Sequence, residues 1–248
     1  MVYENVLAGS FIYALGALAG KTAEPNEIIK DSVNFFQQTP SDQKLSDLLA
    51  NWKGNNFLIE FKRTIKDVNR EMEKNQKVKL ISELKKNNKL LINSKKCHFI
   101  CYGLYKPASD NKITTDICFN FYLDAFSKNI NKGVNCNNFI STILNGKLGI
   151  SDQKEFNEYL NFLLEIEESE NLNSGSFVNK KQKPIKGILT SITNDGKIIF
   201  IEYSGYRNLI LQLNQKHNLL QSLSIQNNKE ISAVKHKVRT KGKGPSLS

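Results

Sequence analysis

Hydrophobic and polar positions are arranged most distinctly in residues 45–64, where two apolar runs flank a short polar segment. The segment at 53–56 contains glycine and asparagine, which adopt positive φ at little cost, so it predicts a tight β-turn. The apolar run at 57–59 predicts a strand, and charged residues then alternate with Phe61. Because side chains alternate along a strand, Glu60 and Lys62 are expected on the same face.

The rest of the first half predicts helices around this hairpin. Residues 5–20 are uncharged and predict a buried helix that ends at Gly20. Asn26 can cap a second helix over 27–38, where Ile28, Ile29, Val33 and Phe36 form an apolar stripe. Residues 64–90 have apolar positions at helical spacing, with a mostly cationic surface that is either solvated or flanks a phosphate track. The apolar run at 97–103 predicts a central strand.

The second half continues the alternation of helices and strands. We expect a loop at 107–111, a strand over 113–126, and helices over 136–147 and 152–170, the second capped by Asp152 with Glu155. A polar loop at 171–183 precedes a hairpin over 188–203, and residues 209–223 predict a strand or a helix. This pattern predicts a mixed α/β (α+β) fold with a core domain at 1–128, an accessory α+β region at 129–234 and a disordered basic tail at 235–248.

Composition and charge indicate an anionic partner. The chain has 248 residues, 40% of them hydrophobic, with a net charge of +11 and a pI of about 9.4. Nucleic acid and an anionic membrane surface both fit such a charge. The uncharged run at 5–20 is short for a membrane span and follows Glu4 rather than a basic segment, so neither a span nor a secretory signal is expected. The four cysteines match no zinc pattern and favour reduced thiols in the cytoplasm.

The residues with the most specific chemistry are Asp47, Glu60 and Lys62. If Asp47 lies on the first strand of the hairpin, its carboxylate comes near that of Glu60 on the second strand. Two adjacent carboxylates repel each other unless a cation lies between them, and a divalent ion with oxygen ligands meets this need. Lys62 could then orient or deprotonate a water molecule, or stabilise the charge of a phosphorane. The alternative is a surface hairpin with a cross-strand ion pair.

Asp47 followed by Glu60-Phe61-Lys62 at the end of an apolar strand resembles the signature of the PD-(D/E)XK nuclease superfamily, although Ser46 replaces the usual proline. The resemblance covers residues 1–105 and implies a restriction-endonuclease-like core, a central mixed sheet flanked by helices. It also implies that Asp47, Glu60 and the backbone carbonyl of Phe61 hold Mg²⁺ or Mn²⁺ while Lys62 serves the attacking water. In this family a helical acid often joins the site, which here is Glu4 or Glu27. The expected order of elements is helix, hairpin, helix, strand.

These observations predict a metal-dependent endonuclease that hydrolyses phosphodiester bonds, with DNA favoured over RNA, in a defence, restriction or repair system. A single centre of this kind must dimerise or act sequentially to cut both strands. The basic tail is expected to contact nucleic acid through Lys235, Lys237, Arg239, Lys241 and Lys243. The alternatives are a non-catalytic basic protein that binds nucleic acid or a partner subunit, and a membrane-associated protein anchored by residues 5–20.

Overall fold

The computed structural model describes residues 2–22, 32–35, 46–71, 73–107, 113–126, 133–173, 186–192 and 198–204. The chain divides into two compact units, Met1–Gly205 and Tyr206–Ser248. All described residues belong to the first unit. The predicted element at 209–223 and the basic tail, with its five candidate nucleic-acid-binding residues from Lys235 to Lys243, lie outside the described residues.

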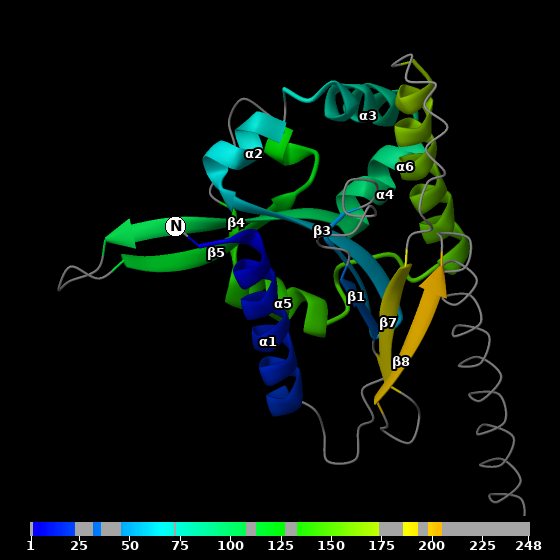
Figure 1. Ribbon diagram of the computed structural model, residues 1–248. Helices are drawn as coiled ribbons and strands as arrows, with labels where there is room; N and C mark the ends of the chain where they lie inside the picture. Colours follow the sequence, from blue (N-terminus) through cyan, green and yellow to red (C-terminus); the bar gives the residue numbers. More distant parts are fainter. Residues whose placement is uncertain are drawn as a thin grey trace, which may run out of the picture. The chain divides into compact units, whose positions relative to one another are not determined.

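The first unit contains one mixed sheet of eight strands in the order β6-β5-β4-β3-β2-β1-β7-β8. The strands are β1 (Ser32–Phe35), β2 (Leu48–Trp52), β3 (Asn55–Thr64), β4 (His98–Pro107), β5 (Ile113–Phe121), β6 (Val134–Asn135), β7 (Lys186–Ile192) and β8 (Ile198–Ser204) (Figure 1). Strands β3 and β4 are parallel, and the other neighbouring pairs are antiparallel. The predicted mixed α/β class is confirmed. Strands β6, β7 and β8 of this sheet come from the region 129–234 that was expected as an accessory region.

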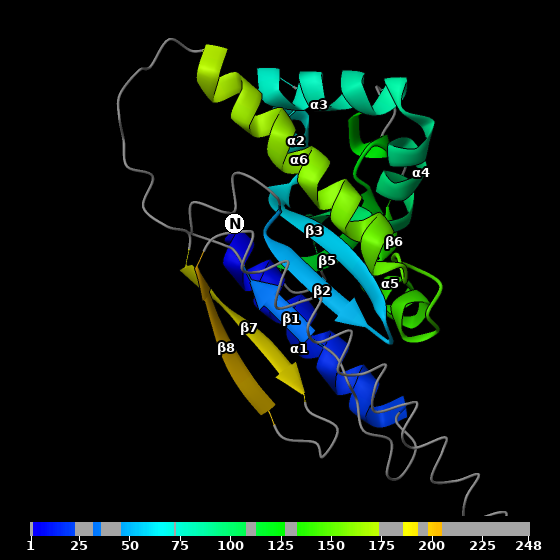
Figure 2. The same cartoon turned by 90° about the vertical axis from the view of Figure 1, so that its right-hand side faces the viewer.

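Helices pack on both faces of the sheet. Helix α1 (Glu4–Thr22) and helix α5 (Cys136–Leu144) cover one face, where Phe11 of α1 contacts Phe61, Phe119 and Phe139. On the opposite face, α6 (Gln153–Asn173) places the Tyr159 hydroxyl 2.9 Å from Nδ1 of His98 on β4. Figure 2 shows α6 on the same side as α3 (Asn75–Lys86) and α4 (Asn88–Cys97).

The predicted order of helix, hairpin, helix and strand is confirmed. Helix α1 precedes the β2–β3 hairpin, and three helices, α2 (Ile65–Glu71), α3 and α4, connect β3 to its parallel neighbour β4. A parallel pair needs a long crossover of this kind. The crossover packs α2 against β3, where Glu60 and Lys62 lie, and brings Lys77 of α3 within electrostatic reach of Glu60.

The predicted helix at 27–38 is wrong, because residues Ser32–Phe35 form strand β1. Val33 pairs with Ala50 of β2 on one side and with Thr190 of β7 on the other. The strand is therefore fixed by partners from two distant segments, and this pairing overrides the helical spacing of the apolar residues. The rest of the predicted helix, with its capping residue Asn26 and the candidate acid Glu27, lies outside the described residues.

Several predicted boundaries also shift. Cys97 is the last residue of α4, so the strand expected at 97–103 begins at His98, and it continues to Pro107. The strand expected over 113–126 ends at Phe121 and is followed by a short 3₁₀ helix, Asp124–Phe126. Residues 171–173, expected in a loop, end helix α6. The cap of this helix is confirmed, since Oδ1 of Asp152 accepts hydrogen bonds from the backbone N–H groups of Lys154 and Glu155.

Helix α1 packs on the core through its apolar side. In the part of the chain that the structure describes, none of the helices combines the length and the hydropathy that crossing a membrane requires. The apolar side of α1 instead supplies Leu7, Phe11 and Leu15 to the core.

Candidate metal and phosphodiester site

The β2–β3 hairpin sets Asp47 and Glu60 opposite each other. Its turn consists of Lys53 and Gly54, which have φ values of 47° and 81°, so the glycine lies in the left-handed region where a side chain would be strained. Leu48 pairs with Ile59, and Asp47, one residue earlier, therefore falls opposite Glu60. Opposed residues of an antiparallel pair share one face of the sheet. The hairpin and the approach of the two acids are as the sequence predicts.

Asp47 and Glu60 are both buried, but their pKa values are shifted in opposite directions. Asp47 is 7% exposed and Glu60 is 6% exposed. Oδ2 of Asp47 accepts a hydrogen bond from the backbone N–H of Phe61 at 2.5 Å. Burial, together with the charge of Glu60, raises the pKa of Asp47 to about 8. The site therefore resembles a carboxylate pair in which like charges force one member to keep its proton.

Glu60 remains ionised because it has cationic neighbours. The Nζ atom of Lys62 lies 2.7 Å from Oε1 of Glu60. Although burial acts to raise the pKa of Glu60, the charges of Lys62 and Lys77 outweigh it and lower the pKa to about 2. One acid of the pair thus carries a fixed negative charge, while the other can lose a proton when a cation approaches.

Lys62 is held by two acids rather than one. Besides Glu60, its Nζ atom lies 3.3 Å from Oε1 of Glu71, the last residue of α2. The same oxygen of Glu71 is 2.6 Å from Nζ of Lys74. Burial acts to lower the pKa of Lys62, but the two carboxylates overcome this effect and raise the pKa above its ordinary value. Lys62 is therefore a protonated donor at neutral pH and not a base.

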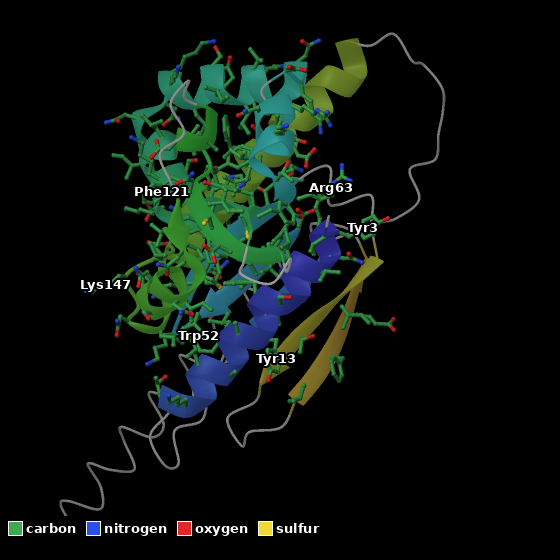
Figure 3. All side chains as sticks on the ribbon, turned by 90° about the vertical axis from the view of Figure 1, so that its left-hand side faces the viewer. Tyr3, Tyr13, Trp52, Arg63, Phe121 and Lys147 are labelled. Atoms are coloured by element: carbon green, nitrogen blue, oxygen red, sulfur yellow. The ribbon has the colours of Figure 1, made fainter. Side chains whose placement is uncertain are left out.

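Glu4 lies beside this group, as one of the two predicted helical acids. It begins α1 and accepts a hydrogen bond from the backbone N–H of Arg63, next to Lys62. Figure 3 shows Arg63 near the N-terminal end of α1, close to Tyr3. Burial raises the pKa of Glu4, which also interacts electrostatically with Lys62 and Glu60.

The sequence did not reveal three further members of the site. Lys77 of α3, His98 of β4 and Tyr122, just beyond β5, all interact electrostatically with Glu60. His98 shares the sheet face of Glu60, because it pairs with Leu58, two residues before Glu60. The crossover helices and β4 bring these residues together, and no short spacing in the sequence marks them. Glu71 was equally hidden among the many charges of residues 64–90.

The donor atoms can be tested against the metal that the resemblance implies. Among the residues that the structure describes, no three His, Cys, Asp or Glu side chains form a group that could hold a metal ion. Asp47 and Glu60 supply two carboxylates, and the backbone of Phe61 lies against Asp47, to which its N–H donates. Mg²⁺ accepts one or two carboxylates and completes its shell with water. These hard oxygen donors fit Mg²⁺ or Mn²⁺.

The segment Cys97-His98-x-x-Cys101 does not form a metal centre. Cys97, Cys101 and His98 are all buried, and burial raises the pKa values of both thiols well above the ordinary value. The ring of His98 instead stacks on Tyr122 at 3.9 Å between centroids. All four cysteines of the chain are free thiols.

Comparison with family models, curated proteins and solved structures found no match to this chain.

Proposed function

We propose that this chain is a metal-dependent nuclease that hydrolyses phosphodiester bonds, with DNA as the expected substrate. The observation that carries the proposal is the buried pair Asp47 and Glu60 at the end of the β2–β3 hairpin, with the Lys62 ammonium 2.7 Å from Glu60. The order α1, β2–β3 hairpin, crossover helices and parallel β4 supports it, because the resemblance to the PD-(D/E)XK superfamily requires the same order. A restriction-endonuclease-like core is part of this proposal.

Each residue has a role that follows from its charge. Asp47, Glu60 and the Phe61 carbonyl would hold Mg²⁺ or Mn²⁺, with Glu4 next to them. A divalent ion bound there polarises a phosphoryl oxygen and lowers the pKa of water. Because Lys62 keeps its proton, it orients the attacking water as a donor or stabilises the negative charge that develops on the phosphorus oxygens. Deprotonation of the water by Lys62, an option that the sequence left open, is not favoured.

The net charge and the free cysteines support the proposed substrate and compartment. With a net charge of +11, the chain is suited to a polyanion, and its binding to nucleic acid should weaken steeply with salt. The four free cysteines fit a reducing, cytoplasmic compartment. With one centre per chain, cleavage of both strands of a duplex requires a second copy, a partner subunit or two sequential events. Restriction, defence and repair systems all meet this description.

A nuclease assay on three single variants tests the proposal. Asp47→Ala, Glu60→Ala and Lys62→Ala should each abolish magnesium-dependent cleavage of plasmid DNA and leave DNA binding largely intact. The chain offers a matched control in Glu83-Leu84-Lys85, a second Glu-x-Lys that lies on helix α3. Glu83→Ala should cleave at the wild-type rate. Residual cleavage of equal size in the three site variants and the wild type would remove the enzyme hypothesis.

A non-catalytic binding protein is the second candidate, and one observation favours it. Lys62 is already paired with both Glu60 and Glu71, and Glu71 with Lys74, as in an ion-pair network that only stabilises the fold. In that case the wild-type chain binds nucleic acid or a partner and shows no cleavage with Mg²⁺ or Mn²⁺. Binding would then be insensitive to both metals.

A further inference from the structure

Lys77 is a second lysine at the site, and its surroundings differ from those of Lys62. It lies on α3 and is partly exposed. Its Nζ atom lies 5.3 Å from the centre of the Tyr122 ring, and the two side chains interact electrostatically. A cation over an aromatic face at this distance is attracted by the ring quadrupole.

Lys77 helps to keep Glu60 ionised, but it does so without a direct ion pair. Lys62 already pairs with Glu60 and with Glu71, and Lys74 pairs with Glu71. Within the described part of the chain, Lys77 forms no ion pair with a carboxylate. It nevertheless interacts electrostatically with Glu60 and Glu71, which places it at the same site. The Lys77 side chain is partly exposed and makes no direct ion pair, so Glu60 and Glu71 compensate its charge only from a distance, and it can attract an anion.

The support beneath Lys77 is rigid. Tyr122 is 1% exposed, and its ring stacks on His98 with an interplanar angle of 8°. His98 is fixed in turn by the hydroxyl of Tyr159, 2.9 Å from its Nδ1 atom. Tyr159 of α6 thus fixes the ring of His98, the His98 ring stacks on Tyr122, and the Tyr122 ring attracts the ammonium of Lys77. Such preorganisation reduces the entropy lost when a ligand binds.

We infer that Lys77, positioned by Tyr122, binds a phosphate of the nucleic-acid backbone next to the bond that the Asp47 and Glu60 site cleaves. The inference rests on the proposed function and adds a substrate-binding residue to it. The two lysines have different roles. Lys62 is paired with two acids and acts at the reacting group, whereas Lys77 binds a phosphate of the substrate. A phosphate is the expected ligand because the charge is a compact ammonium that donates hydrogen bonds.

The test compares Lys77→Met with Lys85→Met, which removes the same charge from an exposed position on the same helix. Binding of a short labelled DNA duplex by the full chain is measured over a range of salt concentrations, with calcium replacing magnesium. Lys77→Met should weaken binding about tenfold at low salt and reduce the salt slope by about one, while Lys85→Met should change affinity by about twofold or less. Equal losses in the two variants would overturn the inference.

Tyr122→Phe provides a second variant, because it keeps the stacked ring and removes only the hydroxyl, which interacts electrostatically with Lys77. It should weaken binding about threefold with an unchanged melting temperature, and Lys77→Arg should recover most of the affinity. If wild type fails to cleave but Lys77→Met still binds selectively worse, the nuclease proposal fails and the phosphate contact stands. If wild type neither cleaves nor binds the duplex, both are refuted.

Discussion

Replacing Asp47 by asparagine should make the protein more stable in the absence of metal. The change removes a carboxyl that must bind a proton in the folded state at neutral pH, and it retains an oxygen that can accept the N–H of Phe61, which lies 2.5 Å from Oδ2 of Asp47. Burial and the charge of Glu60 raise the pKa of Asp47 from 3.8 to about 8. The folded state therefore binds a proton that the unfolded state releases over this range, and the free energy of unfolding decreases as the pH rises from 3.8 to about 8.

The size of this effect follows from the shift. Each pKa unit corresponds to about 1.4 kcal/mol. At neutral pH the free energy of unfolding of the wild type is therefore lower, by up to about 4 kcal/mol, than it would be if the pKa of Asp47 were unperturbed. Asparagine does not titrate, and Asp47→Asn should gain about 1 to 4 kcal/mol near neutral pH, the lower value applying if its amide finds no acceptor. The gain should vanish toward pH 3.8, where Asp47 is protonated in both states.

Guanidinium denaturation in a chelating buffer at several pH values measures this difference. Addition of Mg²⁺ should then stabilise the wild type more than Asp47→Asn. A ligand at a hundred times its dissociation constant stabilises the folded state by about 2.7 kcal/mol, and only the wild type retains both acids. Parallel pH profiles in chelator would refute the electrostatic argument. Equal stabilisation of wild type and Asp47→Asn by Mg²⁺ would show instead that Asp47 is not a metal ligand.

Two further predictions concern the framework of the site. Burial, with the charge of Lys77, lowers the pKa of His98 from 6.5 to about 3, so its contribution to stability is complete above pH 6.5 and is lost as the pH falls toward 3. His98→Gln has no titrating group at this position, so it should not lose the roughly 1.4 kcal/mol per pH unit that the wild type loses. Acid denaturation of the two proteins measures the difference, and identical profiles would contradict the prediction. Gly149 has a φ of 98°, and a Cβ there would lie 2.9 Å from the Asn56 carbonyl oxygen. Gly149→Ala should lose about 1 to 3 kcal/mol in the free energy of unfolding, whereas Gly9→Ala, with open space around it, should not.

The sequence was sufficient to predict those parts of the site that depend on contacts between residues close together in the chain. Asp47, Glu60 and Lys62 belong to one hairpin with a two-residue turn, so spacing alone predicts which side chains meet. It was insufficient for β1, whose register depends on β2 and on β7, more than 150 positions away from it. It was also insufficient for Lys77 and Tyr122, because only the packing of α3 against the end of β5 brings them together. Local patterns predicted the hairpin residues Asp47, Glu60 and Lys62, whereas tertiary contacts bring Glu71, Lys77 and Tyr122 to them.

Under the proposed function, Glu71 would keep Lys62 in place when a divalent ion binds at Asp47 and Glu60. Lys62 is shared between Glu60 and Glu71, at 2.7 Å and 3.3 Å. If an ion engages Glu60, the attraction between Glu60 and Lys62 weakens, and Glu71 remains as the partner that keeps Lys62 charged and in place. Within the described residues, Oε2 of Glu71 has no hydrogen-bond partner, so this carboxylate has spare capacity to accept the displaced ammonium. A lysine held by Glu60 alone would have no such second position.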